Sequence, residues 1–169
     1  MKKILLALFV LGVTACTSFA QTKDSDAGKF SIGVDAGLPV GNASNVYTFA
    51  IGGSLKYDMP IGSGAFVNLT AGYQSFMVKS ALKDLGFPSS SGFVPVKLGL
   101  KYYFDGQGFY GEGQLGVAFS TESGGGKAFA YAPGVGYTLD GGLDLGVRYE
   151  AWSHDGTISQ VALRVAYSF

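Results

Sequence analysis

From Lys29 to Phe169, apolar residues recur at every second position along most of the chain. A period of two places alternate side chains on opposite faces of a β-strand, whereas an amphipathic helix repeats its apolar residues every three to four positions. The 27 glycines, 13 phenylalanines and 10 tyrosines fit many short strands joined by turns. We therefore predict an all-β chain whose strands cover residues 30–38, 47–59, 67–73, 94–104, 109–119, 129–139, 143–151 and 161–169.

The connections between these segments alternate in character. Three are short and rich in glycine, as periplasmic turns are, and the others are candidates for external loops. An even number of strands places both chain termini of the barrel on the periplasmic side. We therefore predict an eight-stranded antiparallel up-and-down transmembrane β-barrel. The predicted turns are 60–64, 105–108 and 140–142, and the predicted external loops are 39–46, 78–92, 121–127 and 153–157.

The hairpin around residues 105–108 offers a test of register. Residues directly opposite each other in an antiparallel pair share one face of the sheet. If Leu98 lies opposite Leu115 on the apolar face, the same register places Lys101 opposite Glu112 on the polar face. Both patterns agree without a slip, which supports the predicted pairing.

The ionic residues of the polar face are balanced in sign. Buried charges must pair, so equal numbers are expected of a closed interior. An eight-stranded barrel has room for little beyond its own side chains. An open ion path, or water-filled pockets beside interior glycines such as Gly52 and Gly116, are the alternatives. The predicted interior network comprises Asp35, Lys56, Asp58, Lys97, Lys101, Glu112, Asp144, Arg148, Glu150 and Arg164.

Aromatic residues of the apolar face gather near both ends of the strands. Such rings prefer the headgroup level of a bilayer, so this placement favours lipid outside the barrel. The alternative is a soluble lipocalin-like barrel with the apolar face inside. The predicted periplasmic girdle is Tyr57, Phe104, Phe109, Tyr137 and Phe169, and the external girdle is Tyr47, Tyr73, Phe119, Phe129 and Tyr149.

The first 20 residues have the pattern of a secretory signal peptide. Basic residues follow Met1, an apolar stretch comes next, and a small-x-small cleavage site ends at Ala20. Cys16 stands in a sequence like a lipobox, so lipidation at Cys16 competes with cleavage after Ala20. Residues 21–28 would then form a short N-terminal segment, and residues 29–169 the barrel.

Charge and cysteine content exclude several classes of function. Because Lys2 and Lys3 lie in the signal, 10 of the 12 basic residues remain beside 12 acidic ones. Such a balance offers no electrostatic footprint for nucleic acid. Cys16 is the one cysteine, so cleavage after Ala20 leaves no disulfide or thiol chemistry. We expect no cofactor and no metal.

The last nine residues, 161–169, alternate in polarity and end with Tyr167, Ser168 and Phe169. This pattern resembles the C-terminal signature of outer-membrane proteins. The barrel region as a whole is similar to the small OmpA/OmpX-like outer-membrane β-barrel domain family of Gram-negative bacteria. The resemblance implies an integral protein of the bacterial outer membrane, lipid as its surroundings, and recognition of the final strand by the barrel-assembly machinery. It implies no particular activity.

Some outer-membrane barrels are enzymes that modify lipid A, so the one histidine, His154, needs consideration. It lies between Ser153 and Asp155 at the predicted external rim. A catalytic triad needs members that converge from separate positions, which three consecutive residues do not provide. Lipid A deacylases carry a His-x-Ser pattern on the strand, and residues 149–153 contain no histidine. Glycines 124–126 also lack the Lys-Ser/Thr that follows a phosphate-binding loop. We predict no catalytic site.

Two prolines inside predicted strands and one long loop each allow more than one interpretation. Pro95 and Pro133 stand inside predicted strands, where proline removes a ladder hydrogen bond. A bulge or a strand terminus is the preferred interpretation, and a weakened seam that admits a lipid or an apolar compound is the alternative. Loop 78–92 contains Leu82, Leu85 and Phe87, which could either cover the barrel mouth or dock a partner.

The leading functional hypothesis is a non-enzymatic barrel with a packed polar interior. It would present its external loops to an unknown partner in a structural or surface-interaction role. The alternatives are a narrow channel or transporter for small or apolar molecules, and a lipid A-modifying outer-membrane enzyme.

Overall fold

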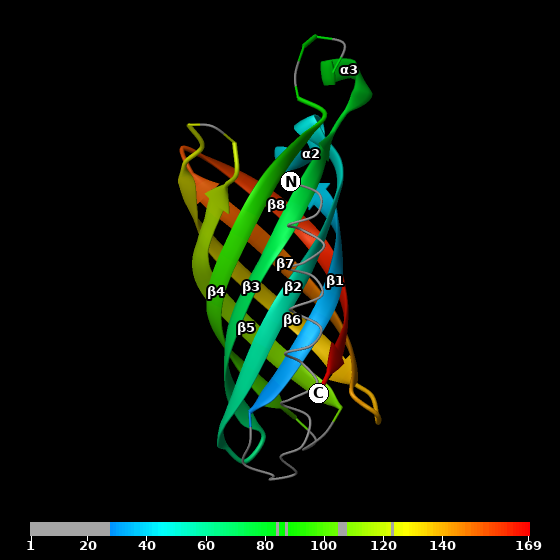
Figure 1. The fold of residues 1–169 in the computed structure, drawn as a ribbon, viewed down its shortest axis with the longest axis vertical. Coiled ribbons are helices and arrows are strands. Elements are labelled where there is room, and N and C mark those ends of the chain that lie inside the picture. Colours follow the sequence, from blue (N-terminus) through cyan, green and yellow to red (C-terminus); the bar gives the residue numbers. More distant parts are fainter. Residues whose placement is uncertain (1–27, 84, 87, 105–107, 123) are drawn as a thin grey trace, which may run out of the picture.

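The computed structural model describes residues 28–83, 85–86, 88–104, 108–122 and 124–169. Eight antiparallel strands form a closed barrel in chain order, because β8 pairs with β1 as well as with β7 (Figure 1). The predicted fold is therefore confirmed. The strands are β1 (Lys29–Val40), β2 (Tyr47–Gly62), β3 (Ala65–Val78), β4 (Ser90–Tyr103), β5 (Phe109–Ser120), β6 (Lys127–Thr138), β7 (Leu143–His154) and β8 (Gly156–Ser168), with short helices α2 (Ala43–Val46) and α3 (Ser80–Lys83) in two connections.

The predicted signal peptide over residues 1–20, Cys16 within it, and residues 21–27 lie outside the described residues. Their assignment stays a prediction. Among the described residues, no helix combines the length and the apolar character that a membrane crossing needs.

The two ends of the barrel differ. The turns β2–β3, β4–β5 and β6–β7 lie at one end, here named periplasmic by the convention of such barrels, and α2 and α3 lie at the external end (Figure 1). All four external connections are shorter than predicted, and two of them differ most. The long one is reduced to residues 79–89, and the last is a tight turn in which His154 pairs with Gly156 around Asp155.

The apolar face of the sheet points outward and the polar face lines the interior. Leu98 is 59% exposed, whereas Lys101, three residues along the same strand, is 3% exposed. The predicted register holds, with Leu98 opposite Leu115 and Lys101 opposite Glu112. The alternative of a soluble barrel with an apolar lumen is therefore wrong, since a continuous exposed apolar belt suits lipid and not water.

Nine of the ten predicted girdle residues expose their rings on the outer surface, and Tyr47 is the exception. Its ring packs edge-to-face on the buried Phe76, with ring centroids 5.2 Å apart. The β2–β3 ladder shifts register between Tyr47 and Phe49. Because such a bulge interrupts the strict alternation of faces, Tyr47 belongs to the interior.

Pro95 and Pro133 interrupt the hydrogen-bonded pairing of neighbouring strands without shifting its register. Within the described ladders, Pro95 has no partner on β3 and Pro133 has none on β7, while the register is the same on both sides of each gap. On their other sides they pair with Ala118 and Gly113. The predicted bulge or strand terminus is therefore wrong. Proline has no N–H to donate, and one missing bond per strand accounts for each gap.

Candidate functional site

The periplasmic part of the lumen holds a cluster of buried ion pairs. The ammonium Nζ of Lys56 lies 3.0 Å from Oε1 of Glu112. Nζ of Lys101 lies 3.3 Å from Oδ2 of Asp144 and 3.6 Å from Oδ2 of Asp58. Lys101 thus lies opposite Glu112 in the β4–β5 pairing, as predicted. Its ammonium group, however, forms ion pairs with Asp58 and Asp144. Each buried charge has an opposite charge within reach, which offsets part of the cost of removing it from water.

Neutral polar groups complete this cluster. The Tyr110 hydroxyl donates to Oδ1 of Asp144 at 2.8 Å, and the Asn68 amide donates to Oε1 of Glu112 at 2.7 Å. The Lys101 ammonium also lies over the Tyr110 ring, 3.9 Å from its centroid. A buried carboxylate needs several hydrogen-bond donors, and these groups supply part of that set.

A second cluster occupies the middle of the barrel. Glu150 accepts from Nζ of Lys97 at 2.6 Å and from Nε of Arg148 at 2.8 Å. Nη1 of Arg148 lies 2.8 Å from Oδ1 of Asp35. The indole Nε1–H of Trp152 donates to Oε1 of Glu150 at 3.0 Å. Glu150 is therefore held by one cation from β4 and by a second cation and an indole from two neighbouring inward-facing positions of its own strand, β7.

Arg164 and Ser54 connect the two clusters. Nε of Arg164 donates to Oγ of Ser54 at 3.1 Å, and Ser54 donates to Oδ2 of Asp35 at 2.7 Å. Nη1 of Arg164 lies 3.6 Å from Oδ1 of Asp144. We call this continuous network the ionic layer. The ten residues predicted for it all lie on the inner face: Asp35, Lys56, Asp58, Lys97, Lys101, Glu112, Asp144, Arg148, Glu150 and Arg164.

The inner glycines do not create water-filled pockets. A Cβ atom on Gly116 would collide with the carbonyl oxygen of Val96, and one on Gly52 would collide with that of Tyr73. Neighbouring backbone therefore occupies the space that a side chain would need. These glycines allow strands to approach closely on the concave side of a narrow barrel.

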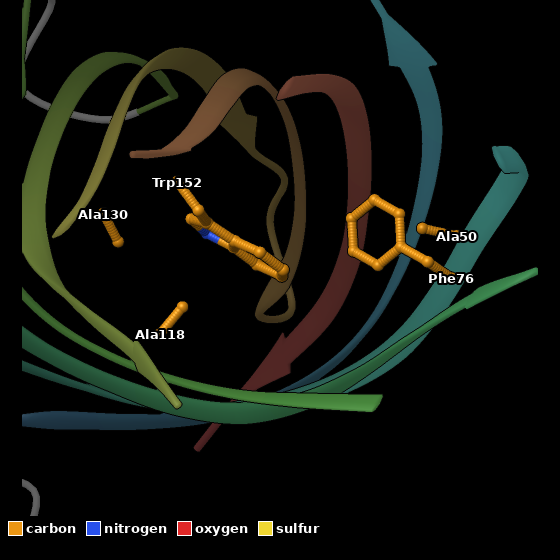
Figure 2. Packing of buried hydrophobic residues seen from close by; sticks show 5 residues of the cluster. All are labelled: Ala50, Phe76, Ala118, Ala130 and Trp152. Atoms are coloured by element: carbon orange, nitrogen blue, oxygen red, sulfur yellow. The ribbon is translucent and has the colours of Figure 1, made fainter. Parts of the chain in front are cut away.

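Aromatic side chains fill the lumen above the ionic layer. Phe76 and Trp152 are buried with ring centroids 5.2 Å apart, and Phe93 lies 4.9 Å from Trp152 and 5.8 Å from Phe76. Figure 2 shows Trp152 and Phe76 inside the ring of strands, with alanines beside them. We call this set the aromatic layer: Phe76, Phe93 and Trp152 with the small residues Ala50, Ala118 and Ala130.

The sequence prediction missed the aromatic layer. Phe76, Phe93 and Trp152 occupy inward positions of β3, β4 and β7, where the alternation predicts polar residues. Large rings on the polar face near the external strand ends were the available signal. Small residues at the inward positions Ala50, Ala118 and Ala130 leave the volume that these rings fill.

Above the aromatic layer, the barrel mouth forms an open cavity of about 470 Å³, which we call the vestibule. Its lower wall includes Phe93, Ala118 and Trp152, and its sides include Tyr47 and α2. The remaining lining residues are Asn42, Ser120, Gly126, Lys127, Ala128, His154, Asp155, Gly156, Thr157 and Ile158.

The histidine lies at the vestibule rim in an exposed position. The His154 side chain is 64% exposed and its Nε2 lies 3.6 Å from Oδ2 of Asp155, which is 99% exposed. The hydroxyl of Ser153 faces that of Thr157 at 3.4 Å. Within the described part of the chain, His154 therefore has an exposed carboxylate as its ionic partner, and its neighbour Ser153 bonds elsewhere. This geometry does not resemble a triad with a shielded base.

The long external connection points away from the mouth. Helix α3 projects beyond the barrel rim (Figure 1). Leu85 is 74% exposed, so it does not plug the lumen. Phe87 lies outside the described residues.

The final strand presents the predicted assembly signal to the outside. Tyr167 and Phe169 expose their rings on the lipid-facing surface and pack edge-to-face with centroids 5.2 Å apart. The Phe169 backbone N–H donates to the carbonyl of Phe30 at 2.8 Å, which closes the barrel seam. Their recognition by the assembly machinery stays a prediction.

The fold has close counterparts among solved structures. The outer membrane enzyme PagL matches with a TM-score of 0.61 at 16% identity, over 81% of this chain and 98% of that chain. The Yersinia pestis outer membrane protein Ail matches with a TM-score of 0.60 at 15% identity, over 85% and 100%. The N-terminal barrel of Pseudomonas aeruginosa OprF matches with a TM-score of 0.60 at 12% identity, over 85% and 100%. No family model and no curated protein matches the sequence.

The chain has the fold of the small outer-membrane β-barrels. Together with its apolar outer belt and paired interior charges, this fold makes the protein an integral barrel of the bacterial outer membrane. The resemblance to OmpA/OmpX-like barrels holds at the level of fold. The neighbours include an attachment protein and an enzyme, so the fold itself does not select a role.

Proposed function

We propose that this protein is a closed, non-enzymatic outer-membrane barrel that presents its external loops to a partner at the cell surface. The observation that carries this proposal is the filled lumen. Buried ion pairs occupy its periplasmic and middle parts, and Phe76 and Trp152 pack above them. A lumen packed with side chains supports a scaffold better than a conduit.

The external loops supply the surface for such a partner. Residues 79–89 form the longest external connection and carry the exposed Leu85. Loops held on a rigid barrel are the usual place for binding function. In sequence, the loops and adjoining strand ends hold Lys79, Lys83 and Lys127 beside Asp84, Glu122 and Asp155. This balance favours a partner that is not strongly charged.

Ail provides a useful contrast, because it has been solved in complex with the heparin analogue sucrose octasulfate. A polyanion of that kind needs an excess of cations to bind. Since this chain balances its loop charges, we expect its partner to differ in chemistry. In a heparin-affinity experiment at physiological salt, the purified protein should elute with the unbound fraction.

Three measurements test the proposal. Planar-bilayer recordings should show no stepwise conductance, and lipid A from cells with and without the protein should have the same mass spectrum. A Leu85→Cys variant should react with a membrane-impermeant maleimide on intact cells. Regular conductance steps would favour the channel hypothesis, and a new lipid A species would favour the enzyme. If Leu85→Cys folded into the barrel but did not react, residue 85 would not be accessible at the cell surface, which would contradict the proposed role of this loop.

A further inference from the structure

The vestibule is an apolar cavity with a closed floor. Its floor consists of Phe93 and Trp152, and its walls include Ala118, Ala128 and Ile158. A cavity of about 470 Å³ falls within the size range of small-molecule sites. An engineered apolar cavity of roughly 150 Å³ already holds benzene, so the vestibule has room for a larger aromatic molecule.

Trp152 lies beneath this cavity, with its polar atom turned away from it. Its Nε1–H is already donated to Glu150 at 3.0 Å. The ring is 2% exposed and packs against Phe93 and Phe76. The partly buried Phe93 therefore provides most of the aromatic surface of the floor, with Trp152 packed directly beneath, and such a ring favours another ring in an offset or edge-to-face contact.

The charges around the vestibule select against ions. Lys127, His154 and Asp155 stand at the rim, where they are exposed to water. The other polar side chains of the described wall are the amide of Asn42 and small hydroxyl groups such as those of Ser120 and Thr157, all of them uncharged. An ionic ligand would lose its hydration in this wall without gaining an opposite charge.

The side chains beneath the floor would stop a bound molecule from passing through the barrel. Beneath Trp152 lies Glu150 with Lys97 and Arg148, and these charges hold one another at 2.6 and 2.8 Å. An apolar molecule that entered from outside would have to break this network to continue. The vestibule is therefore a dead end for such a molecule.

We propose that the vestibule is a binding site for a small uncharged aromatic molecule that enters from the external side and rests on Trp152 and Phe93. This inference goes beyond the proposed scaffold role, because it assigns a small-molecule site and not a macromolecular surface. A failure of one would leave the other intact, since the two are measured by different experiments.

The chain contains one tryptophan, so Trp152 reports on the site directly. The probe is 4-bromobenzyl alcohol, whose bromine quenches indole fluorescence on contact. With the full chain in lipid nanodiscs, we expect quenching that saturates with probe concentration. The charged analogues 4-bromobenzoate and 4-bromobenzylammonium should give weaker quenching, because the wall offers no counter-charge.

Variants separate the site from partition of the probe into lipid. Ala128→Phe places a ring inside the vestibule, and it should weaken the apparent affinity about tenfold or more because ring and probe compete for one volume. Ala36→Phe, on the lipid-facing side of β1, adds the same ring outside the cavity and should leave the quenching curve unchanged. Ala118→Leu is a second filling variant, and heat-modifiable gel mobility selects the variants that fold.

The outcomes decide the matter. Saturable quenching that both filling variants weaken and the control retains supports the site. Quenching that rises linearly and equally in all proteins reflects lipid partition and would overturn the proposal. Saturable quenching that survives both filling variants, or no quenching of the native protein, would overturn it as well.

Discussion

The ionic layer and the aromatic layer fill the same lumen by opposite means. In the ionic layer, opposite charges fill the lumen in pairs, as where Nζ of Lys97 lies 2.6 Å from Oε1 of Glu150. In the aromatic layer, Phe76 and Trp152 fill space beside alanines, and ring geometry replaces charge pairing. Trp152 belongs to both, because its indole N–H donates to Glu150.

The difference shows that a narrow barrel can be closed by two kinds of complementarity. An ionic layer depends on complete sets of partners, because one missing partner leaves a charge uncompensated in a poorly solvated interior. An aromatic layer depends on volume, because a missing ring leaves a cavity. Loss of a single side chain should therefore cost more in the ionic layer than in the aromatic layer.

The largest expected effect is that of Glu150→Ala. This change leaves Lys97 and Arg148 close together without the carboxylate between them, and should lower the free energy of unfolding by about 4 kcal/mol. Urea unfolding from lipid vesicles, followed by Trp152 fluorescence, measures the loss. If Glu150→Ala cost less stability than Phe76→Ala in the aromatic layer, the expected order of the two layers would be reversed.

The next largest effect is that of Phe76→Ala. This ring is fully buried between Tyr47, Phe93 and Trp152. Its removal should cost about 3 kcal/mol in the same unfolding measurement, through lost burial and the cavity that remains. Planar-bilayer recordings of this variant should still show no conductance, because the ionic layer continues to close the lumen. Conductance steps in the Phe76→Ala variant would mean that the aromatic layer, and not the ionic layer, closes the lumen to ions.

A matched pair of glycines on β5 tests how tightly the interior is packed. An added Cβ on inward-facing Gly116 would meet the backbone of Val96 and Lys97, whereas one on outward-facing Gly113 would meet nothing within 4 Å. Gly116→Ala should therefore destabilise the barrel by about 2 kcal/mol. Gly113→Ala should be neutral or slightly stabilising, since alanine restricts the unfolded chain. Equal effects of the two changes would indicate that the interior has spare room.

The smallest expected loss of stability comes from a change at Trp152, the residue that both layers share. Trp152→Phe keeps an aromatic ring but removes the N–H that Glu150 accepts. Because Lys97 and Arg148 still bond Glu150, the loss should be about 1 kcal/mol. Gel-based unfolding measures this variant, which has no tryptophan fluorescence. A loss as large as that of Glu150→Ala would show that the indole, and not the cations, holds this carboxylate in place.

Much of the barrel follows from sequence because the relevant signals are local. Alternation within each strand places Leu98 outside and Lys101 inside, and the short connection at residues 104–108 sets the register of β4 against β5. Tyr47 was misplaced because its outward position depended on unbroken alternation, and the bulge in β2–β3 pairing is not visible in the alternation of β2.

The sequence by itself determined the number of strands, the face of each strand that meets lipid and the set of residues that carry interior charge. Only the tertiary structure decided which of these charges pair. Lys97 and Glu150 are 53 positions apart in sequence, and Lys56 and Glu112 are 56 apart. These partners face each other across the lumen of the closed barrel, so strand tilt and side-chain length decide which groups meet. The alternation of polarity within one strand carries no information about the strand on the opposite side.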